Sequence, residues 1–223
     1  MLKIALLGAE STGKTQLTQA LADSLRSRGH TVALVPEWLR SWCEQAGRTP
    51  RADEQLAIAR TQSAHIAEAA RHPNTHGPHS PHYLLADTTA LMTAVYSDLL
   101  FGDESLYPYA WEQQRRFDLT LVTGLDLPWV ADGLQRDGQH MREPVNARLR
   151  AALARGGIAY QVVYGRGAAR TAHALNAIDS IAGHANESNV GGIFSSQRAW
   201  TWNCEKCSDP VCEHRLFSGL LNR

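Results

Sequence analysis

Short runs of apolar residues alternate along the chain with longer segments in which apolar residues recur every three or four positions. The short runs predict β-strands over residues 2–7, 31–35, 83–86, 119–123 and 160–164. The longer segments predict helices over residues 16–28, 53–71, 89–100 and 144–155, which end close to a glycine or a proline. Strands that alternate with helices indicate a parallel sheet with helices on both faces. The pattern therefore predicts a three-layer α/β fold around a five-stranded parallel sheet.

Candidate functional residues follow four of the predicted strands. A glycine-rich segment follows the first strand, Glu37 the second, Asp87 the third and Asp126 the fourth. The carboxyl ends of parallel strands lie along one edge of a sheet, and ligands bind at that edge. We therefore expect these residues to belong to a single site.

Composition and charge restrict the domain organisation and the partners. The 223 residues include 43% hydrophobic residues, with 22 Lys and Arg balanced by 22 Asp and Glu. This length suits one α/β domain, expected over residues 1–182 with a lid at about 125–143, and a C-terminal extension over 183–223. The even charge argues against nucleic acid as a partner, and no apolar stretch approaches the roughly 20 residues of a membrane span. We expect a cytoplasmic location and leave the oligomeric state open.

The segment behind the first strand carries the strongest functional signal. Its residues are Gly8, Ala9, Glu10, Ser11, Thr12, Gly13, Lys14 and Thr15, and a predicted helix beginning at Gln16 follows. A strand, a glycine turn of this spacing and a helix form a phosphate-binding loop, whose backbone N–H groups converge on a nucleotide. Lys14 is expected to reach the β- and γ-phosphates, and the Thr15 hydroxyl to ligate Mg²⁺. The segment predicts ATP and Mg²⁺ as cofactors, bound by Gly8 and by residues 10–16.

Asp87 ends a buried run, close to the expected position of Mg²⁺ and of the transferred phosphate. A carboxylate there either binds Mg²⁺, directly or through water, or orients and deprotonates an acceptor hydroxyl. Capping of the following helix is a third use of an aspartate at this position. All three roles stay open at this point.

Substrate-facing candidates follow the second and third strands. Glu37, Trp38 and Arg40 come after the second strand, and Tyr96 lies on the helix after Asp87. An aromatic ring beside a carboxylate suits a flat, cationic or nucleoside-like ligand. The alternative is that Trp38, Trp42 and Tyr96 pack between the helices and the sheet.

The segment after the fourth strand has the composition of a lid. It runs from Asp126 through Trp129 to Gly138 and is rich in glycine and arginine. Arg136 and Arg142 are the candidates to stabilise charge on the transferred phosphate, and closure of such a lid excludes water. Arg148 and Arg150 are expected on the solvated face of the next helix.

Taken together, these motifs resemble the ribosylnicotinamide kinase domain of bacterial NadR proteins, over about residues 1–180. The resemblance is carried by the phosphate-binding loop with Glu10, the segment 36–40, Asp87 with the two threonines that follow, Tyr96, and the segment 126–133. It implies a P-loop kinase that uses ATP and Mg²⁺ to phosphorylate the ribose 5′-hydroxyl of nicotinamide riboside. It also implies that Asp87 activates the acceptor, that Glu37 and its aromatic neighbour line the acceptor pocket, and that Arg136 and Arg142 belong to the lid. Asp126 and Trp129 join the substrate-binding candidates.

The chain departs from the NadR pattern in ways that leave other functions open. Pro36 stands where an aromatic residue is usual, and Gln135 stands at the usual lid arginine, with Arg136 next. The adenylyltransferase domain and helix-turn-helix region of NadR have no counterpart here, so only the phosphorylation step is expected. The alternatives are a kinase for another nucleoside or metabolite, and a nucleotide-gated regulatory ATPase whose cysteine-rich tail binds a partner.

The tail gathers possible metal ligands. Cys204, Cys207, Cys212 and His214 lie within eleven residues and suit a structural Zn²⁺, with Cys43 as a possible replacement for His214. Free thiols or a redox-sensitive pair are the alternatives. The histidines at 72, 76, 79 and 82 lie in an irregular proline-containing segment and are expected to be solvated.

Overall fold

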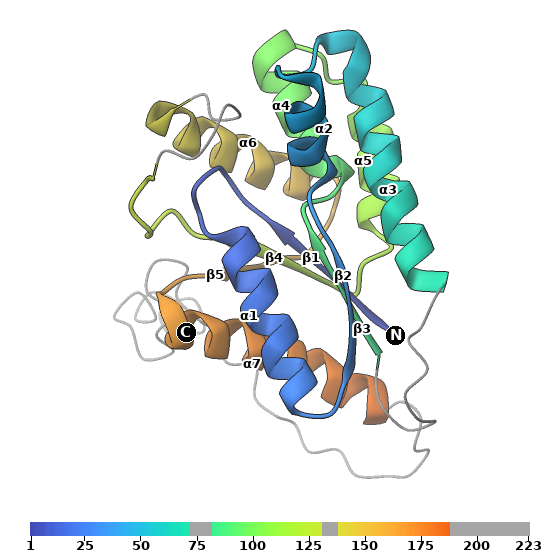
Figure 1. The fold of residues 1–223 in the computed structure, drawn as a ribbon, viewed down its shortest axis with the longest axis vertical. Helices are drawn as coiled ribbons and strands as arrows, with labels where there is room; N and C mark the ends of the chain where they lie inside the picture. Colours follow the sequence, from blue (N-terminus) through green and yellow to red (C-terminus); the bar gives the residue numbers. More distant parts are fainter. Residues whose placement is uncertain (72–81, 131–137, 188–223) are drawn as a thin grey trace, which may run out of the picture.

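The computed structural model describes residues 1–71, 82–130 and 138–187 (Figure 1). Several predicted features lie outside these residues: Arg136 and Gln135 of the lid, the histidines at 72, 76 and 79, and the four candidate zinc ligands Cys204, Cys207, Cys212 and His214. The remaining candidates can all be placed in the fold.

The five predicted strands form one parallel sheet. They are β1 (Leu2–Leu7), β2 (Thr31–Val35), β3 (His82–Asp87), β4 (Leu119–Thr123) and β5 (Gln161–Val163). Their order across the sheet is β2-β3-β1-β4-β5, and every neighbouring pair is parallel. The predicted three-layer α/β fold is confirmed, with β1 and its loop at the centre of the sheet.

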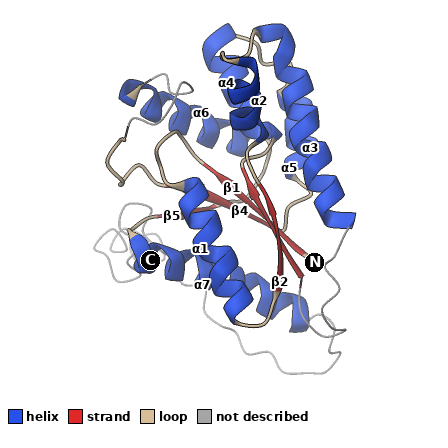
Figure 2. Ribbon diagram, in the orientation of Figure 1, coloured by secondary structure: helices blue, strands red, loops and turns tan. Residues whose placement is uncertain are grey.

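The alternation of side chains along the central strands forms two cores, and Figure 2 shows helices on both sides of the sheet. Ile4 and Leu6 of β1 face α1 (Lys14–Ser27) and α7 (Gly167–Glu187), whereas Ala5 and Leu7 face the opposite layer. That layer contains α3 (Gln55–Arg71), α4 (Ala90–Phe101), α5 (Tyr107–Gln114) and α6 (Arg142–Arg155). Successive residues of a strand point to opposite faces, so one apolar strand supplies both cores.

The four predicted helices are present with small shifts of their ends, and three further α-helices occur among the described residues. Residues 52–54 form a 3-10 turn ahead of α3. The α-helices that the pattern did not predict are α2 (Trp38–Ala46), α5 and α7. Helix α2 is nine residues long and buries only Cys43. Helix α7 buries Ala174, Leu175, Ala177 and Ile178 at helical spacing, a pattern that the sequence contains and that the prediction missed. Helix α7 continues through residue 182 to Glu187.

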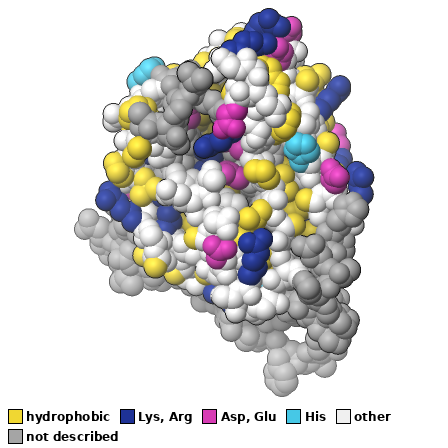
Figure 3. Space-filling model, in the orientation of Figure 1, with side chains coloured by type: hydrophobic (Ala, Val, Ile, Leu, Met, Phe, Trp, Pro, Cys, Tyr) yellow, Lys and Arg dark blue, Asp and Glu magenta, His cyan; other side chains and the backbone are white. Residues whose placement is uncertain are grey.

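Charged side chains of both signs are interspersed on the face shown in Figure 3. No helix in the described ranges is long and apolar enough to cross a membrane.

Candidate active site

The loop between β1 and α1 has a backbone that requires glycine at two positions. Gly8 has φ +149°, and a Cβ there would overlap with the Thr123 hydroxyl on β4. Gly13 has φ +72°, and a Cβ there would lie 2.9 Å from Leu127 Cδ1. Both positions combine a left-handed backbone with a close neighbour, so side chains would displace the loop.

Internal hydrogen bonds stabilise the same loop. The Thr12 hydroxyl donates to the Ala9 carbonyl at 2.7 Å and lies 2.7 Å from the Thr123 hydroxyl. Lys14 Nζ donates to the Ala9 carbonyl at 2.9 Å. The Lys14 ammonium therefore lies across the loop whose backbone would surround a phosphate.

Asp87 lies beside the start of α1. It is paired with Leu6 of β1, its side chain is 3% exposed, and its Oδ2 accepts a hydrogen bond of 2.5 Å from the Thr15 hydroxyl. Its Oδ1 has no hydrogen-bond partner among the described residues. A hydroxyl and a carboxylate in contact are oxygen ligands of the kind that Mg²⁺ uses together with phosphates and water.

Thr89, not Asp87, caps the helix that follows β3. The Thr89 hydroxyl accepts a hydrogen bond of 3.2 Å from Leu91 N and donates one of 2.6 Å to Gln114 Oε1. Gln114 in turn donates to the Thr120 hydroxyl of β4 at 2.9 Å. The helix-capping alternative for Asp87 is therefore not what the structure shows, and its carboxylate is directed at Thr15.

Thr88, between Asp87 and the cap, has an unusual backbone conformation. Its φ is +67°, a left-handed value that is rare for a β-branched residue, and its N–H donates to the Leu6 carbonyl at 3.0 Å. Backbone strain of this kind occurs at functional sites, where the surrounding structure maintains it. Thr88 adopts this conformation directly after Asp87 and also lines a neighbouring pocket.

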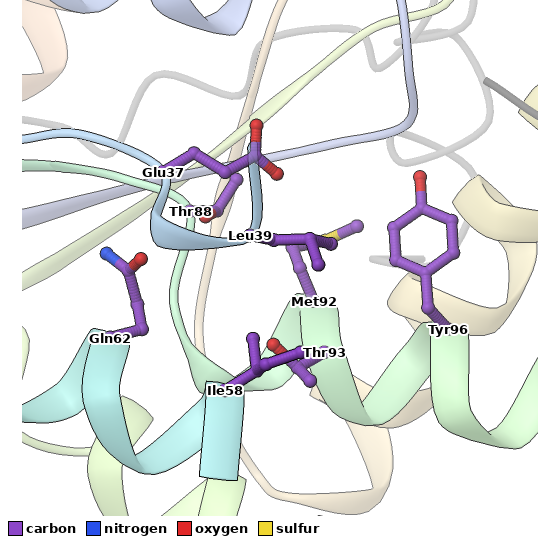
Figure 4. Close-up of a pocket in the computed structure, with 8 residues that line it drawn as sticks. All are labelled: Glu37, Leu39, Ile58, Gln62, Thr88, Met92, Thr93 and Tyr96. Carbon is purple, nitrogen blue, oxygen red and sulfur yellow. The ribbon is translucent and has the colours of Figure 1, made fainter. Parts of the chain in front are cut away.

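That pocket lies between the end of β2, α3 and α4 (Figure 4). Its space is about 10 Å³, room for about one water molecule. The residues that line it are Glu37, Leu39, Ile58, Gln62, Thr88, Met92, Thr93 and Tyr96. Glu37 is the charged residue of this set, and the set contains no lysine or arginine. The pocket therefore presents a carboxylate among mainly apolar and hydroxyl-bearing side chains.

Gln62 on α3 holds the backbone on both sides of Glu37. Its Oε1 accepts a hydrogen bond of 2.7 Å from Trp38 N, and its Nε2 donates to the Pro36 carbonyl at 3.2 Å. Gln62 is buried, so both bonds are shielded from water. The sequence reasoning missed this residue because a lone glutamine on a helix carries no local functional signal.

The other residues proposed to bind the acceptor differ in their position relative to the pocket. Tyr96 lines the pocket, and its hydroxyl donates to Glu10 Oε1 at 3.4 Å. The Trp38 ring packs edge-on against His65 of α3, with ring centroids 5.2 Å apart, and is absent from the pocket lining. Arg40 Nη2 lies 3.8 Å from Glu37 Oε2. The packing alternative describes Trp38, whereas Glu37 and Tyr96 face one pocket.

The segment after β4 contacts the phosphate-binding loop. The Ser11 hydroxyl accepts from Val130 N at 2.8 Å, and Arg142 Nη2 donates to the carbonyls of Leu127 at 2.9 Å and Leu125 at 3.4 Å. Asp126 Oδ2 accepts from Gly165 N at 2.7 Å. Arg142, 7% exposed, thus braces the backbone of residues 125–127 in this structure. Trp129 is partly buried, and its indole N–H has no partner among the described residues.

A groove of about 570 Å³ opens beside Gly13, between α1 and α7. Gln16, Leu127 and Arg170 line it together with small and apolar side chains of both helices. Burial lowers the pKa of the Arg170 guanidinium, and the charge of Asp126 partly opposes this shift. The sequence pattern did not point to Arg170 either, because this residue lies 158 positions from Thr12, the loop residue that it contacts.

The sequence profile of a family described as AAA domain matches residues 3–170. The chain belongs to the AAA domain family. No curated protein matches it. The residues that make up the loop, Asp87 and the pocket all fall within the AAA domain match.

Solved structures share the fold of this AAA domain. NadR in complex with NAD and AMP-PNP aligns with a TM-score of 0.64 at 20% identity, over 89% of this chain and 52% of the NadR chain. NadR in complex with NR aligns with a TM-score of 0.62 at 21% identity, over 89% and 54%. Thymidylate kinase from Ehrlichia chaffeensis aligns with a TM-score of 0.55 at 13% identity, over 81% and 98%. The resemblance to the NadR kinase domain is confirmed at the level of the fold, and this chain spans about half the length of NadR.

Proposed function

We propose that this AAA domain is an ATP- and Mg²⁺-dependent kinase that phosphorylates the ribose 5′-hydroxyl of nicotinamide riboside. The observation that carries the proposal is the contact between Thr15 and Asp87, because it joins the phosphate-binding loop to the strand end that leads into the acceptor pocket. In addition, the solved structures with this fold include NadR with AMP-PNP and NadR with NR.

The described residues suit transfer of a phosphoryl group to an alcohol. The backbone of residues 8–15 and the Lys14 ammonium would hold the triphosphate, and Thr15 and Asp87 would hold Mg²⁺, which neutralises phosphate charge when bound. The acceptor oxygen attacks the γ-phosphorus, the bond from that phosphorus to the bridging oxygen of ADP breaks, and Asp87 accepts the hydroxyl proton. Asp87 suits this role because it lies outside the loop and contacts it directly, through Thr15.

The pocket lining favours an acceptor without a phosphate. Its charged residue is Glu37, whose Oε2 lies 3.8 Å from Arg40 Nη2 outside the lining; the carboxylate would attract a cationic ring such as nicotinamide and repel a nucleoside monophosphate. Tyr96 offers a ring and a hydroxyl on the opposite side of the pocket (Figure 4). The pocket would have to widen to admit a nucleoside, because its space now holds about one water molecule.

A panel of acceptors tests the proposal. Purified protein with Mg-ATP is incubated with nicotinamide riboside, uridine, thymidine or thymidine monophosphate, and both ADP and the product mass are measured. We expect nicotinamide riboside to give a monophosphate. Turnover of a neutral nucleoside alone would contradict the proposed acceptor but would still support a kinase activity. ATP binding without turnover of any acceptor would favour the regulatory ATPase instead.

A further inference from the structure

Arg170 of α7 hydrogen-bonds the backbone of the phosphate-binding loop. It is 4% exposed, its Nη2 donates to the Thr12 carbonyl at 2.9 Å, and its Nη1 donates to the Gly165 carbonyl at 3.4 Å. The described part of the chain places no carboxylate within salt-bridge distance of it, and its Nε has no partner there. The hydrogen bonds of this buried guanidinium therefore go to two backbone carbonyls.

The bond to Thr12 constrains the next peptide N–H. A trans peptide is planar, and its C=O and N–H point in opposite directions. Because Arg170 holds the Thr12 carbonyl toward α7, the N–H of Gly13 must point away from α7. Gly13 has φ +72° and immediately precedes α1, at the point where a phosphate-binding loop presents its N–H groups to the ligand.

The positive charge acts in the same direction. Hydrogen bonds from a charged donor are stronger than those from a neutral donor, and a buried cation without a salt bridge attracts phosphate through a medium of low dielectric constant. Asp126, whose charge influences Arg170, is itself bonded to Gly165 N. Arg170 and Asp126 thus bond the carbonyl and the N–H of Gly165, in the loop between β5 and α7.

We infer that Arg170 is a positioning residue for the donor nucleotide, which acts by fixing the Thr12–Gly13 peptide so that the Gly13 N–H faces the phosphates. The inference rests on the nucleotide site of the proposed function but not on the identity of the acceptor.

The test compares three variants by calorimetric titration with ATP and with adenosine, without an acceptor. Arg170→Met keeps the length of the side chain but removes the donors, and Arg170→Lys keeps a cation with a single donor group. Arg28→Met is the control for loss of an arginine contact to α7, because Arg28, an exposed residue that follows α1, bonds Asp179 of α7 at 3.0 Å, away from the loop.

We expect Arg170→Met to weaken ATP binding at least about tenfold, the equivalent of one charged hydrogen bond, and to leave adenosine binding unchanged. Arg170→Lys should recover part of the loss, and Arg28→Met should bind ATP like the wild type. If Arg170→Met does not fold, Arg170→Lys decides, with an expected loss of about threefold or more.

An ATP affinity within about twofold of the wild type in the folded Arg170 variants would overturn the inference. Equal losses for ATP and adenosine would also overturn it, because the role would then be general packing rather than phosphate positioning. If the wild type itself does not bind ATP, the nucleotide site of the proposed function fails as well. If the wild type binds ATP but phosphorylates no acceptor, only the proposed acceptor reaction fails.

Discussion

Thr15 Oγ1 lies 2.5 Å from Asp87 Oδ2, although the two residues are 72 positions apart in the chain. Two features of the fold produce this contact: α1 starts at Lys14, at the end of the loop that follows β1, and Asp87 is the register partner of Leu6. The Thr15 hydroxyl donates the hydrogen bond, so Oδ2 is an acceptor here, and Oδ1, which has no partner among the described residues, is the oxygen that can take a proton or a metal.

Replacement of this carboxylate should separate chemistry from donor binding. We expect Asp87→Asn to lower kcat about a hundredfold or more, the usual contribution of a general base, with ATP affinity changed only slightly. Lys14→Ala, which removes the cation on the phosphates, should instead abolish turnover together with tight ATP binding. ADP release and titration with ATP measure the two effects. Near-normal rates in both variants would contradict the assigned roles.

Loss of the Gln62 amide should affect the acceptor. Gln62→Leu removes both hydrogen bonds that flank Glu37, and we expect the KM for the acceptor to rise about tenfold while the KM for ATP stays unchanged. Thr61→Ala is the control, because the neighbouring Thr61 hydroxyl bonds only within α3, to the Ala57 carbonyl at 2.9 Å. Equal effects of the two substitutions would show that Gln62 has no special role.

The left-handed backbone at Thr88 gives a prediction about stability. Thr88→Gly should be about 1 kcal/mol more stable than Thr88→Ala, because glycine adopts φ +67° without strain and alanine does not. At Thr93, inside α4, the order should reverse by a similar amount, since glycine weakens a helix interior. Urea denaturation of the four variants measures both differences. The same order at both positions would argue against strain at Thr88.

An ion pair with a buried carboxylate joins α4, the helix of the acceptor pocket, to α6. Asp98, 6% exposed, accepts hydrogen bonds from Arg148 at 2.7 Å and from the Tyr107 hydroxyl at 2.8 Å. Arg148, expected on the solvated face, is only partly exposed. Arg148→Met should lower the free energy of unfolding by about 2 kcal/mol, because it leaves a buried carboxylate without its cation. Adding Asp98→Asn should restore most of the loss. Failure of the double variant to recover stability would contradict this explanation.

Glu54 should contribute to acid sensitivity. Its side chain bonds Arg48 and accepts from Arg51 N, and these contacts lower its pKa from the ordinary 4.5 to about 2. A carboxyl with a lowered folded-state pKa stabilises the fold above the unfolded-state pKa, and this contribution is lost as the pH falls from about 4.5 to about 2. The urea midpoint should therefore decline less in Glu54→Gln than in the wild type as the pH falls from about 5 to about 3. Asp53→Asn, at an exposed neighbour, is the control, and an unchanged decline in Glu54→Gln would contradict the assignment.

Much of this protein was predictable from local patterns. The apolar runs predicted five parallel strands, and the glycine spacing with Lys14 and Thr15 predicted the phosphate-binding loop, because strand formation and a tight glycine turn depend on neighbouring residues. Because the carboxyl ends of parallel strands lie along one edge of a sheet, the sequence also predicted that Glu37 and Asp87 lie at the same edge. Helix α2 escaped prediction because it is short and buries a single residue, whereas the helical spacing of the buried residues of α7 was present in the sequence and was overlooked.

The sequence by itself determined the strands, the loop and the residue types at the edge of the sheet, since each depends on residues close together in the chain. Only the tertiary structure decided which side chains meet: Asp87 with Thr15, Gln62 with the backbone around Glu37, and Arg170 with Thr12. It also separated Trp38 from the pocket. The physical reason is that these contacts join segments far apart in the chain, and their geometry follows from strand order and helix packing, which no local pattern encodes.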